Sequence, residues 1–167
     1  MRTPEWCEIV EKAQGLFSEA FLSAVNSGVL PEQHRSAATF YLLTPDRCGN
    51  DPFAVQVWMG DFQGLPLDRS TRYVRTSLEK AHRLQVSGPE IQSSWETRDP
   101  ESDKWGGGIK VNDHILSLSG LPELWDEIFV VCVALKSGIA GVKPCLEIME
   151  KSGSRVLFDR YRDQLSI

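Results

Sequence analysis

ATFYLLT at residues 38–44 and FAVQVWM at residues 53–59 are two short runs of β-forming residues, separated by the segment PDRCGNDP at residues 45–52. In the second run Phe53, Val55, Val57 and Met59 fall on alternate positions, as in a strand with one buried face. The separating segment is dense in turn-forming residues. The stretch therefore predicts two strands that pair as a β-hairpin with a long turn.

A second hairpin is predicted at residues 106–120, GGGIKVNDHILSLSG. Ile109 lies on one predicted arm and Ile115 on the other. Between the arms, Asn112-Asp113 suits a tight turn with positive φ angles. The chain thus provides two hairpins, with predicted helices before, between and after them.

Three long helices are predicted from apolar residues at helical spacing, Thr3–Asn26, Asp68–Leu84 and Leu121–Gly138. The middle of the third, residues 128–135, is apolar almost all round, which implies burial on several sides, in the core or at a subunit contact. Residues 143–167 add one or two short helices, broken near Gly153. On the second helix we expect a core face of Val74, Ser77, Leu78, Ala81 and Leu84, and a solvent face of Arg72, Arg75, Glu79 and Arg83.

This order of elements predicts an α+β (α/β) fold, with an antiparallel sheet of four to five strands flanked by helices. A length of 167 residues suits one domain with its own core. Residues 1–141 are expected to form this domain. Residues 142–167 are expected to be a C-terminal helical extension packed on the same domain.

The composition argues against several classes of protein. A net charge of −5 opposes general nucleic-acid binding, and no apolar run approaches the ~20 residues of a membrane span. The first residues do not read as a signal peptide, so we expect a cytoplasmic protein whose four cysteines are reduced. The apolar first and third helices predict a homodimer or higher homo-oligomer.

Three stretches carry a family resemblance. A strand pair runs from Phe40 to the segment 57–61, VWMGD, followed by a Gly-Leu-Pro loop at residues 64–66. The second predicted helix contains Lys80-Ala81. Gly-Gly-Ile at residues 107–109 then leads into a hairpin that ends in Ser119-Gly120, with Asp126-Glu127 beyond it.

In this order and spacing the chain, from Thr3 to Gly138, resembles the GlcG/HbpS-like family of small haem-binding and glycolate-operon proteins. Lys110 stands where that family usually has proline, and the hairpin between Gly108 and Ser119 is several residues shorter than usual. The resemblance implies a profilin-like α/β/α sandwich that often forms oligomers. In some members it implies binding of haem or a related small ligand.

The candidate ligand site lies where the glycine-rich segment meets the second helix. Glycines let the backbone approach a ligand and present its amides, and the long polar segment 85–105 before them is unusual unless it covers something. Asp126 and Glu127, near the start of a helix, are expected only to favour its dipole. The candidate ligand-binding residues are Lys80, His82, Trp105, Gly106, Gly107, Gly108 and Ser119.

The leading hypothesis is therefore a small-ligand-binding domain without evident catalytic machinery, with haem as one possible ligand. The alternative is a profilin-like or roadblock-like protein–protein interaction module with no small ligand. A ligand binder should have a concave site at Lys80 and residues 106–108, whereas an interaction module should have a flat apolar face. The third hypothesis is an enzyme of unknown reaction. It ranks last because no catalytic constellation is visible in the sequence.

Overall fold

The computed structural model of the chain describes residues 5–30, 37–44, 53–60 and 64–163. Its helices are α1 (Glu5–Asn26), α2 (Leu67–Val86), α3 (Glu123–Ser137), α4 (Val142–Ser152) and α5 (Arg155–Tyr161), with a short 3-10 helix, η2, at Pro100–Ser102. Its strands are β1 (Ala37–Thr44), β2 (Phe53–Gly60), β3 (Gly108–Val111) and β4 (His114–Ser119). The predicted helices and strands are all present, with ends that differ by a few residues.

The strands form one antiparallel sheet in the order β2-β1-β4-β3. Each predicted hairpin is a neighbouring pair, and β1 joins the two hairpins by pairing with β4, Leu42 opposite Leu116. In the second hairpin Asn112 and Asp113 have φ angles of 47° and 66°, which is the turn expected from the sequence. The long turn of the first hairpin, residues 45–52, lies outside the described residues.

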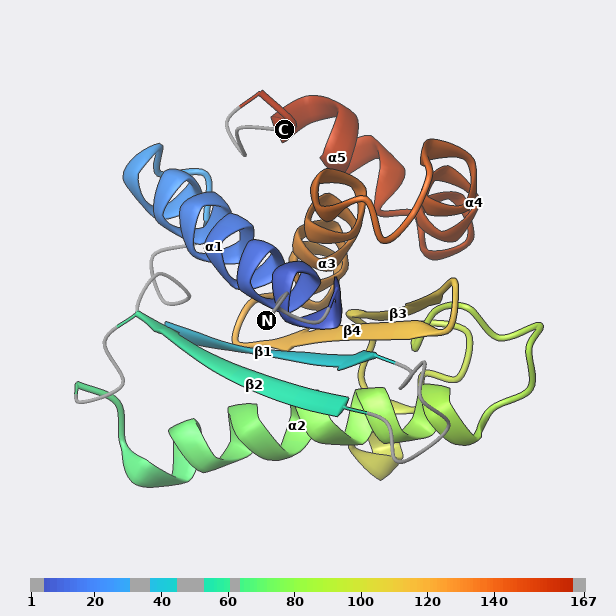
Figure 1. Ribbon diagram of the computed structural model, residues 1–167. Coiled ribbons are helices and arrows are strands. Elements are labelled where there is room, and N and C mark those ends of the chain that lie inside the picture. The colour runs from blue at the N-terminus through green and yellow to red at the C-terminus, as the bar shows by residue number, and fades with distance from the viewer. Residues whose placement is uncertain (1–4, 31–36, 45–52, 61–63, 164–167) are drawn as a thin grey trace.

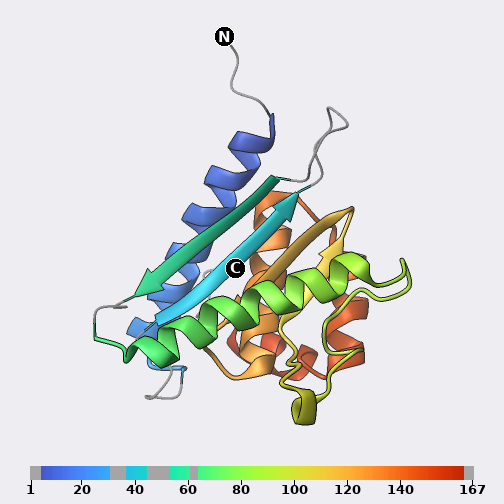
Figure 2. The ribbon, with the colours of Figure 1, turned by 90° about the horizontal axis from the view of Figure 1, so that it is seen from below.

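The molecule is an α/β/α sandwich. Figure 1 shows α1 and α3 on one face of the sheet, with α4 and α5 beyond α3, and α2 on the opposite face. Viewed from the α2 side, α2 lies across β1, β4 and β3, and the connection from its end to β3 folds back beside it (Figure 2). The α+β class and the flanked antiparallel sheet are confirmed. None of the described helices is long and apolar enough to cross a membrane.

The main core lies between the sheet and α1 and α3. Phe17 of α1 stacks on Phe40 of β1 with ring centroids 4.7 Å apart, and Phe129 of α3 meets the edge of Phe17. The apolar middle of α3, residues 128–134, is fully buried inside the chain because α1, α4, α5 and the sheet surround it. Its composition is thus explained without a subunit contact, and homo-oligomerisation stays a prediction.

In the smaller core under α2, the buried and exposed residues of the helix differ in part from those expected. Ala81 and Leu84 are buried against Leu43 and Ile115 as expected, but the side chain of Leu78 is 38% exposed. Lys80, a charged residue, is buried instead. The sheet face that α2 covers therefore contains polar as well as apolar contacts.

A buried carboxylate, not a surface one, occupies position 127. Glu127 Oε2 accepts a 2.6 Å hydrogen bond from Ser93, and its Oε1 accepts hydrogen bonds from Ser152 and Ser154. Burial raises the pKa of this carboxyl, and the serine hydroxyls offset only part of that rise. The expectation that Glu127 serves only the helix dipole was wrong, because this side chain joins the loop after α2 to the turn between α4 and α5.

Candidate functional site

Arg83 anchors the segment between α2 and β3, residues 87–107. Its guanidinium donates to the carbonyl oxygens of Ser94 (3.0 Å), Thr97 (2.6 Å) and Trp105 (2.6 Å), and it also pairs with Glu79 one turn earlier. The expectation that Arg83 faces solvent was wrong. A long loop has carbonyl groups that no strand or helix satisfies, and the several donors of one arginine satisfy three of them.

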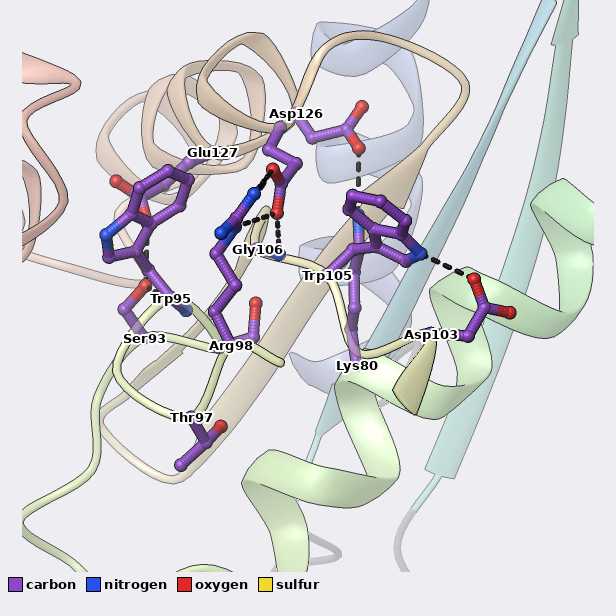
Figure 3. Close-up of polar contacts among 12 residues, drawn as sticks. Lys80, Ser93, Trp95, Thr97, Arg98, Asp103, Trp105, Gly106, Asp126 and Glu127 are labelled. Atoms are coloured by element: carbon purple, nitrogen blue, oxygen red, sulfur yellow. Dashed lines mark hydrogen bonds and ion pairs between the residues drawn. The ribbon is translucent and has the colours of Figure 1, made fainter. Parts of the chain in front are cut away.

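Lys80 and Asp126 form an ion pair inside the protein. Lys80 Nζ lies 2.8 Å from Asp126 Oδ2 and also donates to the carbonyl oxygen of Leu118 at 2.6 Å. The two side chains are 1% and 3% exposed. Figure 3 shows Lys80 reaching from α2 to Asp126 at the beginning of α3. Burial raises the pKa of Asp126 to about 7, although Lys80 and the Leu121 amide oppose the rise.

A cleft of about 430 Å³ opens above this ion pair. Its walls come from one side of α2, the end of the loop at Trp105, and the turn from β4 into α3. The lining includes two aromatic side chains, two arginines and the Lys80–Asp126 pair; in full it is Arg69, Arg72, Tyr73, Thr76, Lys80, Trp105, Ser119, Gly120, Leu121, Pro122, Glu123 and Asp126.

The charged residues in and around the cleft differ in how firmly they are paired. Glu123 is bound by Arg98, with Nε–Oε1 at 2.9 Å, and Asp126 by Lys80. Asp103, outside the lining, lies 3.5 Å from Arg72 and 3.7 Å from Arg75, and all three are exposed. Exposed ion pairs of this kind contribute little stability, so another anion can replace Asp103 at little cost. The arginine side of the cleft is therefore suited to an anionic ligand.

A cation–π stack lies beside Glu123, and of its members only Trp105 lines the cleft. The guanidinium of Arg98 lies over the rings of Trp95 and Trp105, at 5.1 Å and 5.9 Å from their centroids. The indole of Trp105 donates a 2.7 Å hydrogen bond to Asp103 (Figure 3). Although burial opposes its ionisation, the hydrogen bonds from Arg98 and Gly106 hold the pKa of Glu123 below its usual value. These contacts fix Trp105 in the lining of the cleft.

The glycines at 106–108 serve the fold rather than presenting open amides. The Gly106 amide donates to Glu123 Oε1 at 2.6 Å, and the Gly108 amide to Ser94 Oγ at 2.8 Å. Gly107 has a φ of +99°, and a Cβ there would overlap the Cβ of Asp126. Of the expected ligand donors in this segment, the amides of Gly106 and Gly108 are thus already used, and none of the three glycines lines the cleft.

The structure brings part of the predicted site together. Lys80, Trp105 and Ser119 line the cleft. His82 does not: it is exposed, and a residue two positions from Lys80 on a helix points to a different side. Sequence reasoning also missed Tyr73, which no local motif marks. It named Asp126 but expected only an effect on the helix dipole, and so missed its role as the buried partner of Lys80.

In the described part of the chain, no group of three or more histidine, cysteine, aspartate or glutamate side chains is placed to hold a metal ion. Cys132 and Cys145 are buried free thiols, and burial raises the pKa of Cys145 to about 11. The side chains of Cys7 and Cys48 lie outside the described residues.

Comparison of the chain with family models, with curated proteins and with solved structures finds no match. The cleft is therefore the feature of the molecule that bears most directly on its function.

Proposed function

We propose that this protein binds a small planar anion in the cleft between α2 and the β4–α3 turn. The observation that carries the proposal is the lining, which combines two aromatic side chains with two arginines around a concave site of about 430 Å³. Cavities of this size with a few convergent polar groups are the usual form of small-molecule sites. The proposal agrees with what the resemblance to the GlcG/HbpS-like family implies.

Each part of the lining has a distinct role in this proposal. Tyr73 and Trp105 offer ring surfaces to the planar part of the ligand. Arg72 offers a guanidinium that can exchange Asp103 for a carboxylate of the ligand. Glu123 and Asp126 are held by Arg98 and Lys80, so neither needs to be displaced by the anion.

Haem ligated through its iron does not fit this lining well. Haem iron in proteins is usually held by histidine, cysteine, methionine or tyrosine. Among the described residues that line the cleft, tyrosine is the only one of these types, and the hydroxyl of Tyr73 already accepts a 2.9 Å hydrogen bond from Arg69. We therefore place a small organic anion, rather than a haem held by a protein–iron bond, in the cleft.

The test compares two arginines that share one partner. Arg72 and Arg75 both lie beside Asp103, but only Arg72 lines the cleft. Calorimetric titration with phenyllactate and phenylacetate should show binding to wild type and to Arg75→Gln. We expect binding to be weakened about 10-fold or more in Arg72→Gln, the loss of one charge-assisted hydrogen bond, and also in Trp105→Leu.

Equal weakening by Arg72→Gln and Arg75→Gln would mean that the anion does not bind in the cleft. Native mass spectrometry of protein isolated from its own host completes the test, because it reports a retained small molecule directly. A protein that retains nothing and binds none of these aromatic anions would favour the interaction-module alternative.

A further inference from the structure

Lys80 differs from every other lysine of the chain. The chain has seven lysines, all within the described residues, and Lys80 alone is buried. It is also the only one that lines the cleft. An amine in such a position is shielded from bulk water yet borders the space that a ligand would occupy, which is the setting of lysines that form covalent intermediates.

Asp126 is placed to move protons to and from this amine. Its Oδ2 lies 2.8 Å from Lys80 Nζ, within the range needed for direct proton transfer. The elements around the pair also bring Glu123 near Asp126, with Arg98 bound to Glu123. A carboxyl whose pKa is about 7 can both take and return a proton near neutral pH.

We propose that Lys80 forms an imine with the carbonyl carbon of a 2-oxo acid bound in the cleft. This inference rests on the proposed function, because it uses the same cleft and the same arginine side for the carboxylate. The aromatic walls favour a 2-oxo acid with a planar side group, such as phenylpyruvate.

The step balances without an oxidant or reductant. One proton passes from the Lys80 ammonium to Asp126, and the neutral amine adds to the carbonyl carbon. The carbonyl oxygen takes that proton from Asp126. The nitrogen then gives a second proton to the carboxylate. When the C–O bond breaks, the hydroxyl leaves with this proton as water, and the remaining N–H of the protonated imine faces Asp126.

The test traps the imine by reduction. Wild-type protein is incubated with phenylpyruvate and sodium borohydride, and the modified lysine is located by peptide mass spectrometry. We expect the reduced adduct on Lys80, at an occupancy about 10-fold or more above that of any other lysine, because the cleft holds the carbonyl beside this amine. Phenyllactate, which has a hydroxyl in place of the carbonyl, should bind but leave no adduct.

Two variants complete the design. Asp126→Asn should slow trapping at Lys80, and Lys110→Met, which removes a half-buried lysine of β3 outside the cleft, should not change it. An adduct spread evenly over surface lysines would overturn the inference. If phenyllactate still bound in that case, the proposed function would stand; if phenyllactate did not bind either, both would fail.

Discussion

Ser154 donates a 2.8 Å hydrogen bond to Oε1 of Glu127, 27 residues earlier in the chain, and so joins the turn between α4 and α5 to the buried side of α3. Ser154→Ala should lower the free energy of unfolding by about 1–3 kcal/mol, because a buried carboxyl loses one of its donors. Urea denaturation measures this change.

Ser137→Ala is the matched control. The Ser137 hydroxyl is also buried, but it donates to carbonyl oxygens of its own helix, those of Val133 and Ala134. Its removal should cost less, since those carbonyls belong to helical turns that remain intact. An equal decrease in the free energy of unfolding for the two variants would show that the hydrogen bond to Glu127 stabilises the protein no more than a bond within a helix.

The Lys80–Asp126 pair should couple strongly in a double-mutant cycle. Above the pKa of Asp126, where its carboxyl is ionised, Lys80→Met and Asp126→Leu should each destabilise the protein by about 3–5 kcal/mol, because each leaves one buried charge without its partner. The double variant should lose much less than the sum of the two. Urea denaturation of all four proteins gives the coupling free energy, and additive losses would contradict the prediction.

An exposed pair provides the comparison. Arg155 and Asp159 lie 2.8 Å apart on α5 at one-turn spacing, with half-exposed side chains. Their coupling should be within about 1 kcal/mol, as for other solvent-exposed pairs. The two ion pairs have the same separation, so the difference between their coupling free energies reports the effect of burial rather than of distance.

The raised pKa of Asp126 predicts a particular sign of pH dependence. The folded protein holds this proton to about pH 7, whereas the unfolded chain releases it near pH 3.8. The stability that this group contributes is therefore fully present below about pH 3.8 and lost as the pH rises towards 7. The sign is opposite for Glu123, whose pKa is lowered.

Subtracting a variant isolates the contribution of Asp126. The unfolding free energy of wild type minus that of Asp126→Asn should fall between pH 4 and pH 7 and level off above it. Lys80, Glu123 and Arg98 surround the site in both proteins. A difference that grows with pH over this window would show that the attraction of Lys80 outweighs burial.

Local patterns were sufficient to predict the elements of the fold. Alternation in residues 53–59 gave one strand of the first hairpin, and Asn112-Asp113 gave the turn of the second. Gly138 and Gly153, both with φ near +80°, end α3 and α4 where glycine punctuation predicted breaks. Each of these features depends on residues close together in the sequence.

The site depended on pairings that local patterns do not encode. Lys80 and Asp126 are 46 residues apart, and on its own helix Lys80 reads as one more surface charge. Arg83 was misassigned for the same reason, because its acceptors are carbonyl groups of a loop without regular structure. Periodicity reports which side of a helix is apolar, but not which charged residue has a buried partner.

Gly107 should tolerate no side chain. Gly107→Ala combines a positive φ with overlap on Asp126, so we expect a loss above the about 1–3 kcal/mol typical of the backbone strain alone. Gly138→Ala keeps the positive φ without a contact, and Gly141→Ala has neither problem. Thermal unfolding should rank the three in that order, and similar losses for Gly107→Ala and Gly138→Ala would mean that Asp126 moves aside easily.

Arg83→Gln should release the segment 87–107 without unfolding the domain. The guanidinium satisfies three carbonyl groups of this segment, and a glutamine amide cannot reach all of them. The segment keeps the bond from the Ser94 amide to Gly108 and the Arg98–Glu123 pair, so the loss should be local. Hydrogen exchange should therefore rise in peptides covering residues 94–105 while β1 and α3 stay protected.

Arg75→Gln, on the same helix but with a side chain 80% exposed, should leave all peptides unchanged. A uniform rise across the chain would mean that the loop and the core open together.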